Sequence, residues 1–218
     1  MAVSTRKRND PRREATRTAL IEAAESLVAE VGVEAVSTRQ IGAAIGSANT
    51  NVVAYHFGSK EALIREVLRY RLPEIDRRRS ELMEQADRAG QCSDLRTLVR
   101  IFFQPLFEQT DEEGRHSYAR FVVGLERSGM IAARGEVQDE FPQTNILTER
   151  IRAMLPADQT GLFDVRLRLA FGLVASVLLL IDRESGPDAA KAEADFENAI
   201  DMVTAALAAP VNCTQTNN

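Results

Sequence analysis

Histidine and cysteine, the side chains that most often bind metals or act as nucleophiles, are scarce in this sequence of 218 residues. The two histidines, His56 and His116, have no serine, aspartate or cysteine nearby at the spacing of a catalytic motif. A glycine-rich phosphate loop and an HExxH motif are also missing. The sequence therefore argues against an enzyme, and it predicts neither a cofactor nor a metal site.

Features of secreted and membrane proteins are missing as well. Cys92 and Cys213 are the only cysteines, no signal peptide precedes them, and we expect two free thiols in a reducing cytoplasm. The most apolar run, Leu169 to Ile181, has 13 residues, whereas a bilayer needs about 20. We therefore expect a buried helix there and no contact with a membrane.

No stretch alternates with a period of two, so we predict an all-α fold. Asp10 is suited to cap a first helix with Pro11 at its first position, and Gly32 can end it. Longer helices are expected beyond Pro73, with Pro105 kinking one of them. The chain is thus predicted to contain a three-helix helix-turn-helix head and a helical body.

Charge is distributed unevenly along the chain, which has a net charge of −5. Residues 1–60 hold eight basic and six acidic side chains, and residues 61–218 hold nineteen and twenty-six. Six of the basic residues fall within residues 1–17. A basic head on an acidic body is typical of a protein that touches a polyanion at one end, although a solvated basic tail explains the first residues equally well.

Two short helices form the helix-turn-helix. Ser37–Ile45 opens with a capping box made by Ser37 and Gln40, and Asn49–Phe57 ends at Gly58. Apolar residues of these helices and of the first helix can form one small core, which would hold the second short helix outward, as the major groove requires. This core comprises Leu27, Val28, Val31, Ile41, Ile45, Val53 and Phe57.

The exposed side of the second short helix carries side chains that suit DNA. Asn49, Thr50 and Asn51 offer amide and hydroxyl groups for base edges. Tyr55, His56 and Lys60 are placed for phosphate contacts. The plainer alternative is a helical hairpin whose polar side only meets water.

Residues 17–68 resemble the DNA-binding domain of the TetR family of bacterial regulators. The resemblance runs through "ALIEAAESLVAEVGVEAVSTRQIGAAIG" and "NTNVVAYHFGSKEALIREVL", and the segment from Tyr55 to Leu63 is its most characteristic part. The turn "GSANTNVVAYHF" is one residue longer than the commonest family form, which leaves the start of the recognition helix open by about one residue.

The resemblance implies a homodimer that presents two heads to successive major grooves of double-stranded operator DNA. Thr38 and Arg39 would lie near the phosphates, and the basic stretch from Arg6 to Arg17 could reach the backbone or the minor groove. We therefore divide the chain into a basic arm (1–11), a helix-turn-helix domain (12–58), a connecting helix (59–73), a regulatory and dimerisation domain (74–210) and a disordered tail (211–218).

A small effector would bind the body, in a largely apolar cavity beside Pro105. The equally plausible alternative is that the same aromatic residues only fill the core. The residues expected to line the pocket are Phe102, Phe103, Leu106, Phe107, Tyr118, Phe121, Val122, Leu125, Phe171 and Val174.

The last two helices are the candidates for the dimer interface, mostly on the strength of the resemblance, and a purely intrachain core is the alternative. The residues expected there are Val177, Leu180, Phe196, Ile200, Val203 and Leu207. The sequence thus predicts a cytoplasmic DNA-binding repressor that responds to an apolar or aromatic effector. The alternative is an architectural DNA-binding protein that needs no ligand.

Overall fold

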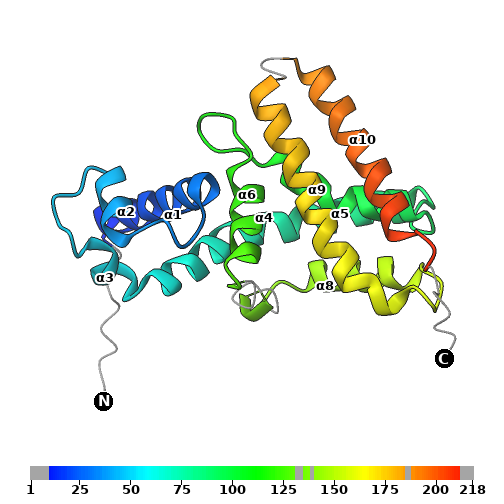
Figure 1. Cartoon of the computed structure of the whole chain (residues 1–218), viewed down its shortest axis with the longest axis horizontal. Coiled ribbons are helices and arrows are strands. Elements are labelled where there is room, and N and C mark those ends of the chain that lie inside the picture. The colour runs from blue at the N-terminus through cyan, green and yellow to red at the C-terminus, as the bar shows by residue number, and fades with distance from the viewer. Residues whose placement is uncertain (1–9, 131–134, 138–139, 185–187, 212–218) are drawn as a thin grey trace, which may run out of the picture.

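The computed structural model describes residues 10–130, 135–137, 140–184 and 188–211, and every regular element within them is helical. This confirms the all-α prediction. Figure 1 shows a small head, formed by the helices Pro11–Val31, Thr38–Ala44 and Val52–Phe57, at one end and a body of packed helices at the other, with the helix Lys60–Arg88 running between them. The helices are α1 (Pro11–Val31), α2 (Thr38–Ala44), α3 (Val52–Phe57), α4 (Lys60–Arg88), α5 (Leu95–Glu108), α6 (Ser117–Arg127), α8 (Pro142–Ala153), η1 (Thr160–Leu162), α9 (Phe163–Glu184) and α10 (Ala189–Leu207).

Local capping chemistry fixes the first two helices where the sequence predicts them. The side chain of Asp10 accepts a hydrogen bond from the Arg12 amide at 3.1 Å, and Pro11 occupies the first helical position. The capping box of Ser37 and Gln40 is complete, with both reciprocal bonds formed. These bonds satisfy amides that have no partner within the helix.

Helix α4 differs from the prediction, because it continues through Pro73 to Arg88 as one helix. Proline removes one backbone donor from a helix, but the side chain of Pro73 is exposed, while Leu72 and Ile75 beside it are buried. Packing of these neighbours offsets the lost hydrogen bond. A single rod therefore joins the head to the body, where the sequence suggested a break.

The core of the head is close to the predicted one. Val28, Ile41 and Val53 are buried, and Leu27, Ile45 and Phe57 pack against them. Val31 is the exception, because it lies at the end of α1 with 58% of its surface exposed. Val52 is also buried in this core, although the sequence analysis did not include it.

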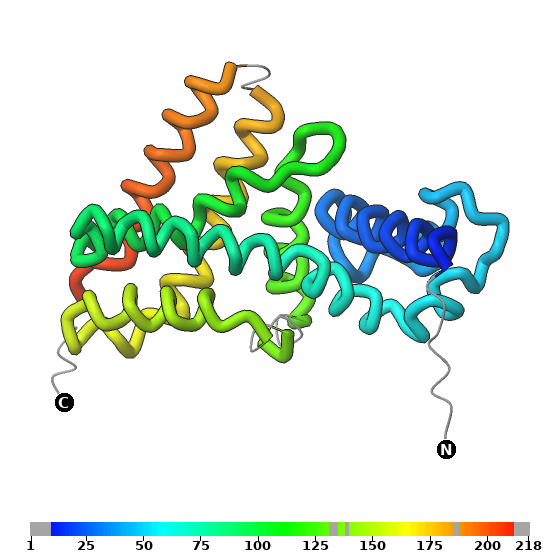
Figure 2. Tube along the Cα trace, turned by 180° about the vertical axis from the view of Figure 1, so that it is seen from behind, coloured from blue at the N-terminus to red at the C-terminus, as the bar shows by residue number. Residues whose placement is uncertain are grey.

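The body places α9 and α10 side by side on one face, with α4, α5 and α8 behind them, as Figures 1 and 2 show. Phe102 and Phe103 of α5 both meet Phe171 of α9 edge to face, with ring centroids 5.6 and 5.2 Å apart. Helix α9 is not buried all round as the sequence suggested, since Leu169 and Leu180 are exposed. Within the described residues, no helix has the length and apolar character needed to cross a bilayer.

Candidate nucleic-acid interface and effector cavity

The turn between α2 and α3 is ordered by short polar side chains. Gly46 adopts a positive φ of 69°, which glycine tolerates best. The backbone N–H of Asn49 donates to Ser47 Oγ at 3.2 Å, and the backbone N–H of Asn51 donates to the side-chain oxygen Oδ1 of Asn49 at 2.9 Å. The side-chain oxygen of Asn49 is therefore engaged inside the turn, which leaves the side-chain nitrogen Nδ2 as the group of Asn49 that the predicted base contact would have to use.

Helix α3 begins at Val52, three residues later than predicted. Asn49 and Thr50 belong to the turn that leads into it, and Asn51 is its N-cap residue. The correction follows from the hydrogen bonds just described, which hold the backbone outside a helical path. Thr50 and Asn51 remain exposed at the N-terminal end of the helix, the end that reads base edges in helix-turn-helix proteins.

Close packing against α2 fixes the orientation of α3. A side chain on Gly42 of α2 would place its Cβ 2.9 Å from Val52 Cγ1, so only glycine fits there without a shift. Val52 and Val53 point inward and are buried, whereas Tyr55 is 69% exposed. The outward face of α3 is thus available to a partner, as the prediction requires.

Arg17 fastens the C-terminal end of α3 to α1 and α4. Its guanidinium donates to the His56 carbonyl and to Glu66 Oε2, both at 2.8 Å, and lies over the Phe57 ring. His56 is half-buried, and its Nδ1 has no hydrogen-bond partner among the residues that the structure describes. Burial, with the nearby charges of Arg13 and Arg17, lowers the pKa of His56 below its ordinary value.

Lys60 stands at the first position of α4, but its ammonium turns toward the loop between α1 and α2. Lys60 Nζ donates to the carbonyl oxygens of Val33 and Val36, each at 2.5 Å. Two of its three donors are therefore used inside the protein. The structure gives Lys60 a role in anchoring this loop, which the sequence did not suggest, because the partners lie 27 and 24 residues away.

The remaining predicted phosphate contacts lie on the surface of the head. Arg39 is exposed and Thr38 is half-buried at the start of α2. Arg12 and Arg13 are exposed on the first turn of α1, and the Arg13 guanidinium lies 5.9 Å from the centre of the Tyr55 ring. The part of the predicted basic arm at residues 6–8 lies outside the described residues.

A short helix held by a tight turn against a second one, with polar residues at its exposed N-terminal end, defines a helix-turn-helix DNA-binding protein. Residues 20–67 match the family model described as "Bacterial regulatory proteins, tetR family". Residues 20–67 therefore form a helix-turn-helix DNA-binding domain of the TetR family of bacterial regulatory proteins. This family is not enzymatic, in agreement with the prediction.

Solved structures that resemble the chain include two of NalD from Pseudomonas aeruginosa, described as the secondary repressor of the MexAB-OprM multidrug efflux pump. They are 25% and 20% identical to this chain, cover 91% and 93% of it and 100% of their own chains, and both have a TM-score of 0.44. A TetR-family regulator from Mesorhizobium loti is 18% identical, covers 90% of this chain and 98% of its own, and has a TM-score of 0.28. No curated protein matches the chain.

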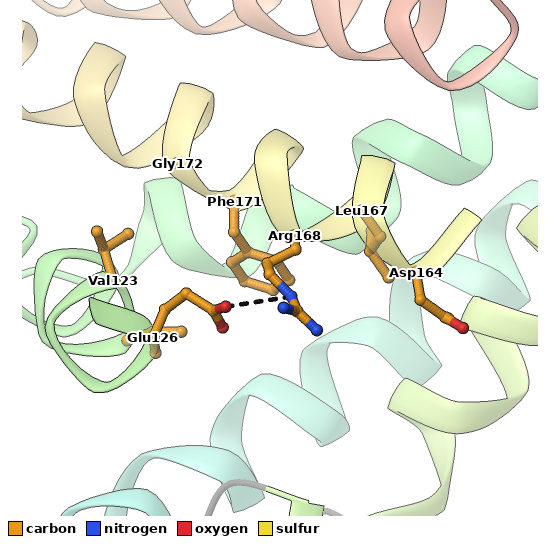
Figure 3. A pocket seen from close by; sticks show the side chains of 8 residues that line it. Val123, Glu126, Asp164, Leu167, Arg168, Phe171 and Gly172 are labelled. Atoms are coloured by element: carbon orange, nitrogen blue, oxygen red, sulfur yellow. Dashed lines mark ion pairs between the residues drawn. The ribbon is translucent and has the colours of Figure 1, made fainter. Parts of the chain in front are cut away.

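The body contains a mostly apolar cavity of about 190 Å³ between α6 and α9. Figure 3 shows Arg168 and Glu126 reaching toward each other across it, with an Nε–Oε1 distance of 3.1 Å, and Phe171 behind them. Val122 and Leu167 add apolar surface to the wall. The ion pair is the main polar feature of a site that is otherwise suited to an apolar molecule.

Two of the ten residues predicted for a ligand pocket, Val122 and Phe171, line this cavity. Others of the set pack against one another in the core. Phe102 and Phe103 meet Phe171 edge to face, and the half-buried Phe107 stacks on Phe196 at 4.4 Å. The buried members of the set that do not line this cavity are Phe102, Phe103, Leu106, Tyr118, Phe121, Leu125 and Val174.

Four residues predicted for a dimer interface belong to the core of the single chain. Phe196, Ile200, Val203 and Leu207 are at most 1% exposed and belong to the buried apolar core of the chain. The prediction is wrong for them, because helical periodicity marks a buried stripe without saying what buries it. Leu180 is 49% exposed and Val177 is half-buried, so both remain available to a partner.

The sequence analysis did not predict a buried pair formed by His116 and Asp182. His116 Nδ1 lies 2.5 Å from Asp182 Oδ1, and His116 Nε2 lies 2.9 Å from the carbonyl oxygen of Phe107. Asp182 is 66 residues away in the sequence, so no spacing motif could have revealed it. The pair joins the start of α6 to the end of α9 and lies in the protein interior, where it links elements.

Proposed function

We propose that the protein is a homodimeric repressor that binds a near-palindromic operator and releases it when a small apolar or aromatic effector binds the body. Under this proposal the protein acts in the cytoplasm, with a head at residues 12–58 and a regulatory domain at residues 74–210. The observation that supports it most is the exposed group of Thr50, Asn51 and Tyr55 at α3, on a helix whose other side is packed.

A second copy of the chain is the partner that best fits the surface of α9 and α10. Val165, Leu169 and Leu180 form an exposed apolar stripe on α9, with Leu173 half-buried between them, and Met202 is exposed on α10. Steps of four, four and seven residues keep this stripe on one side of the helix. An exposed apolar stripe of this kind is typical of a self-complementary interface between two copies.

The cavity between α6 and α9 supports the effector part of the proposal. Its volume of about 190 Å³ is below the ~300–1,000 Å³ that ligand sites usually occupy, so the proposed effector is a small apolar or aromatic molecule. The Glu126–Arg168 pair stands at its wall and offers either a donor or an acceptor.

Helix α6 is the element that can couple this cavity to the head. Val122 and Val123 of α6 line the cavity, while Gly124 on the next position packs against α1. A Cβ on Gly124 would stand 3.2 Å from Val28 Cγ1, which shows how closely the two helices approach. A shift of α6 on ligand binding would therefore move α1, and a tenfold loss of DNA affinity needs only about 1.4 kcal/mol of coupling.

One experiment tests the proposal directly. The purified protein is incubated with a pool of random duplexes, the bound sequences are selected, and the enriched duplex is then challenged with a panel of apolar and aromatic compounds. We expect a two-fold symmetric motif and its release by some compounds. Absence of any enriched motif would refute sequence-specific binding.

The same material separates the proposal from a ligand-independent architectural protein. A specific effector raises the melting temperature of the protein by mass action. If DNA is bound but no compound changes either the melting temperature or the affinity for DNA, the architectural alternative is correct.

A further inference from the structure

A second and larger hollow lies between the head and the body. It has a volume of about 510 Å³, with the C-terminal end of α1 on one wall and the helices α6 and α9 on the other. Ligand sites commonly occupy ~300–1,000 Å³, so this hollow, named here the head–body cleft, is large enough for a small organic molecule. It is separate from the effector cavity, although Val123 and Gly172 border both.

Arg120 of α6 is the unusual group in the cleft. Its side chain is 18% exposed, and it makes no hydrogen bond with any residue that the structure describes. Its one charged contact is with Asp182 Oδ2 at 3.7 Å, and Asp182 already receives His116 on its other oxygen. Arg120 Nε is buried and has no hydrogen-bond partner among the described residues. A buried donor without a partner is costly, so a ligand acceptor that reaches this guanidinium would be favoured.

A second cation lies on the same side of α6. Arg127 follows Arg120 by seven residues, which returns it to the same face of the helix, and it is exposed with no ion pair in the described part of the chain. Of the acidic residues around the cleft, Glu30 already pairs with Arg115 at 3.5 Å, and Glu34 lies on the exposed segment after α1. The wall formed by α6 therefore offers positive charge to a ligand.

The rest of the cleft is partly apolar. Val123, Ala175 and Leu179 provide apolar surface from α6 and α9, and the exposed Val31 stands at the end of α1. A ligand that matches both the cationic and the apolar wall of the cleft has a negatively charged group that pairs with Arg120 and Arg127 and an apolar body that contacts the remaining wall.

We propose that the head–body cleft is a second ligand site, which takes an amphipathic organic anion such as an aromatic or aliphatic carboxylate. Such a ligand contacts α1 of the head and α6 and α9 of the body at once. It therefore acts on the position of the head directly, without passing through the effector cavity, and its binding can be measured in the absence of DNA.

Calorimetric titration of the full-length protein tests the charge requirement. The probes are 3-phenylpropionate and its uncharged amide, which share one apolar body. We expect the carboxylate to bind saturably and at least about tenfold more tightly than the amide, because the amide lacks the charge that a desolvated arginine pairs with. Equal affinity of the two probes, or no saturable binding of the carboxylate, would overturn the proposal.

Substitutions locate the binding site. Arg120→Gln should weaken 3-phenylpropionate at least about tenfold, and Arg127→Gln should weaken it less, because Arg127 is more exposed. Arg88→Gln removes an exposed arginine far along α4 and serves as the matched control, with wild-type affinity. If Arg120→Gln misfolds, as its melting curve would show, Arg127→Gln decides the question, and wild-type affinity in that variant would count against the site.

A fluorescence reporter distinguishes the cleft from the effector cavity. The sequence has no tryptophan, so the Val31→Trp variant carries a single one, at the head side of the cleft. Its emission should change with the same saturation curve as the calorimetric titration. Leu167→Phe narrows the effector cavity alone and should leave 3-phenylpropionate binding unchanged. Loss of binding in Leu167→Phe with a silent tryptophan would place the anion in the effector cavity.

Discussion

Arg71 donates two hydrogen bonds to the buried carboxylate of Glu25, from Nε to Oε2 at 2.6 Å and from Nη2 to Oε1 at 3.0 Å. Glu25 is 1% exposed and also accepts from Ser117 Oγ at 2.5 Å. The three residues belong to α1, α4 and α6, so a single buried carboxylate ties the head to the connecting helix and to the helix that lines the cavity between α6 and α9.

Removing the cation of this group should destabilise the whole protein. In Arg71→Met the Glu25 carboxylate stays buried with only a hydroxyl partner, which costs about 3–5 kcal/mol when one partner of a buried pair is lost. Urea denaturation gives the free energy of unfolding. Arg88→Met, which breaks an exposed pair with Glu84, is the control and should cost less than about 1 kcal/mol. Equal losses would show that the buried group has no special role.

Base-reading and phosphate-contacting residues should separate by their effect on specificity. Thr50→Ala and Asn51→Ala are expected to weaken the selected operator by about 1–3 kcal/mol for each lost base contact, with little effect on random DNA. Arg39→Ala should weaken both DNAs alike and reduce the dependence on salt. Affinities measured for both duplexes at several salt concentrations check this, and equal behaviour of all three variants would contradict the assigned roles.

Lys60→Met tests whether the ammonium anchors the loop or contacts DNA. The structure predicts a loss of about 1–3 kcal/mol in unfolding free energy, because the Val33 and Val36 carbonyls lose the hydrogen bonds donated by the Lys60 ammonium. A phosphate contact predicts instead a normal stability and a salt slope smaller by about one unit. Urea denaturation and salt titration of DNA binding distinguish the two, with the exposed Lys191→Met as the control for stability.

Acid should weaken the fold through His56. Its pKa is lowered in the folded protein by burial and by Arg13 and Arg17, whereas in the unfolded chain a histidine titrates near pH 6.5. The unfolded state therefore binds more protons below about pH 6.5, and the free energy of unfolding falls as the pH drops through that range. Melting temperatures at pH 8 and pH 5 should differ less in His56→Gln than in the wild type. An identical pH dependence in both proteins would exclude His56 as the cause.

A charge on the exposed stripe of α9 should separate the two copies of the proposed homodimer. Leu169→Glu places a carboxylate on a residue that is 69% exposed in the single chain, so the fold should persist while the interface loses affinity. Ile146→Glu changes an exposed residue of α8 and provides the control. Sedimentation analysis is expected to show monomers for the first variant and dimers for the second. If the Leu169→Glu variant is still a dimer, the interface lies elsewhere on the protein.

Local chemistry explains why much of the head was predictable. Asp10, Ser37 and Gln40 act on amides at most three residues away, so their effect can be read directly from their order. The resemblance to the TetR family was also visible in the order of residues, most clearly in the stretch from Tyr55 to Leu63. The start of α3 was missed because the backbone after Gly46 follows side-chain hydrogen bonds of Ser47 and Asn49, which compete with helix formation.

The sequence by itself determined the helical content and the capped starts of α1 and α2, because these depend on neighbours within about one helical turn. The resemblance of residues 17–68 to the TetR DNA-binding domain was also present in the sequence alone. The tertiary structure decided which apolar stripe faces the core and which faces outward, as the buried Phe196 and the exposed Leu169 show. It also decided the partners of Lys60 and His116 and the existence of the head–body cleft. These features depend on how segments far apart in the chain come together, and periodicity along one helix does not specify its neighbours.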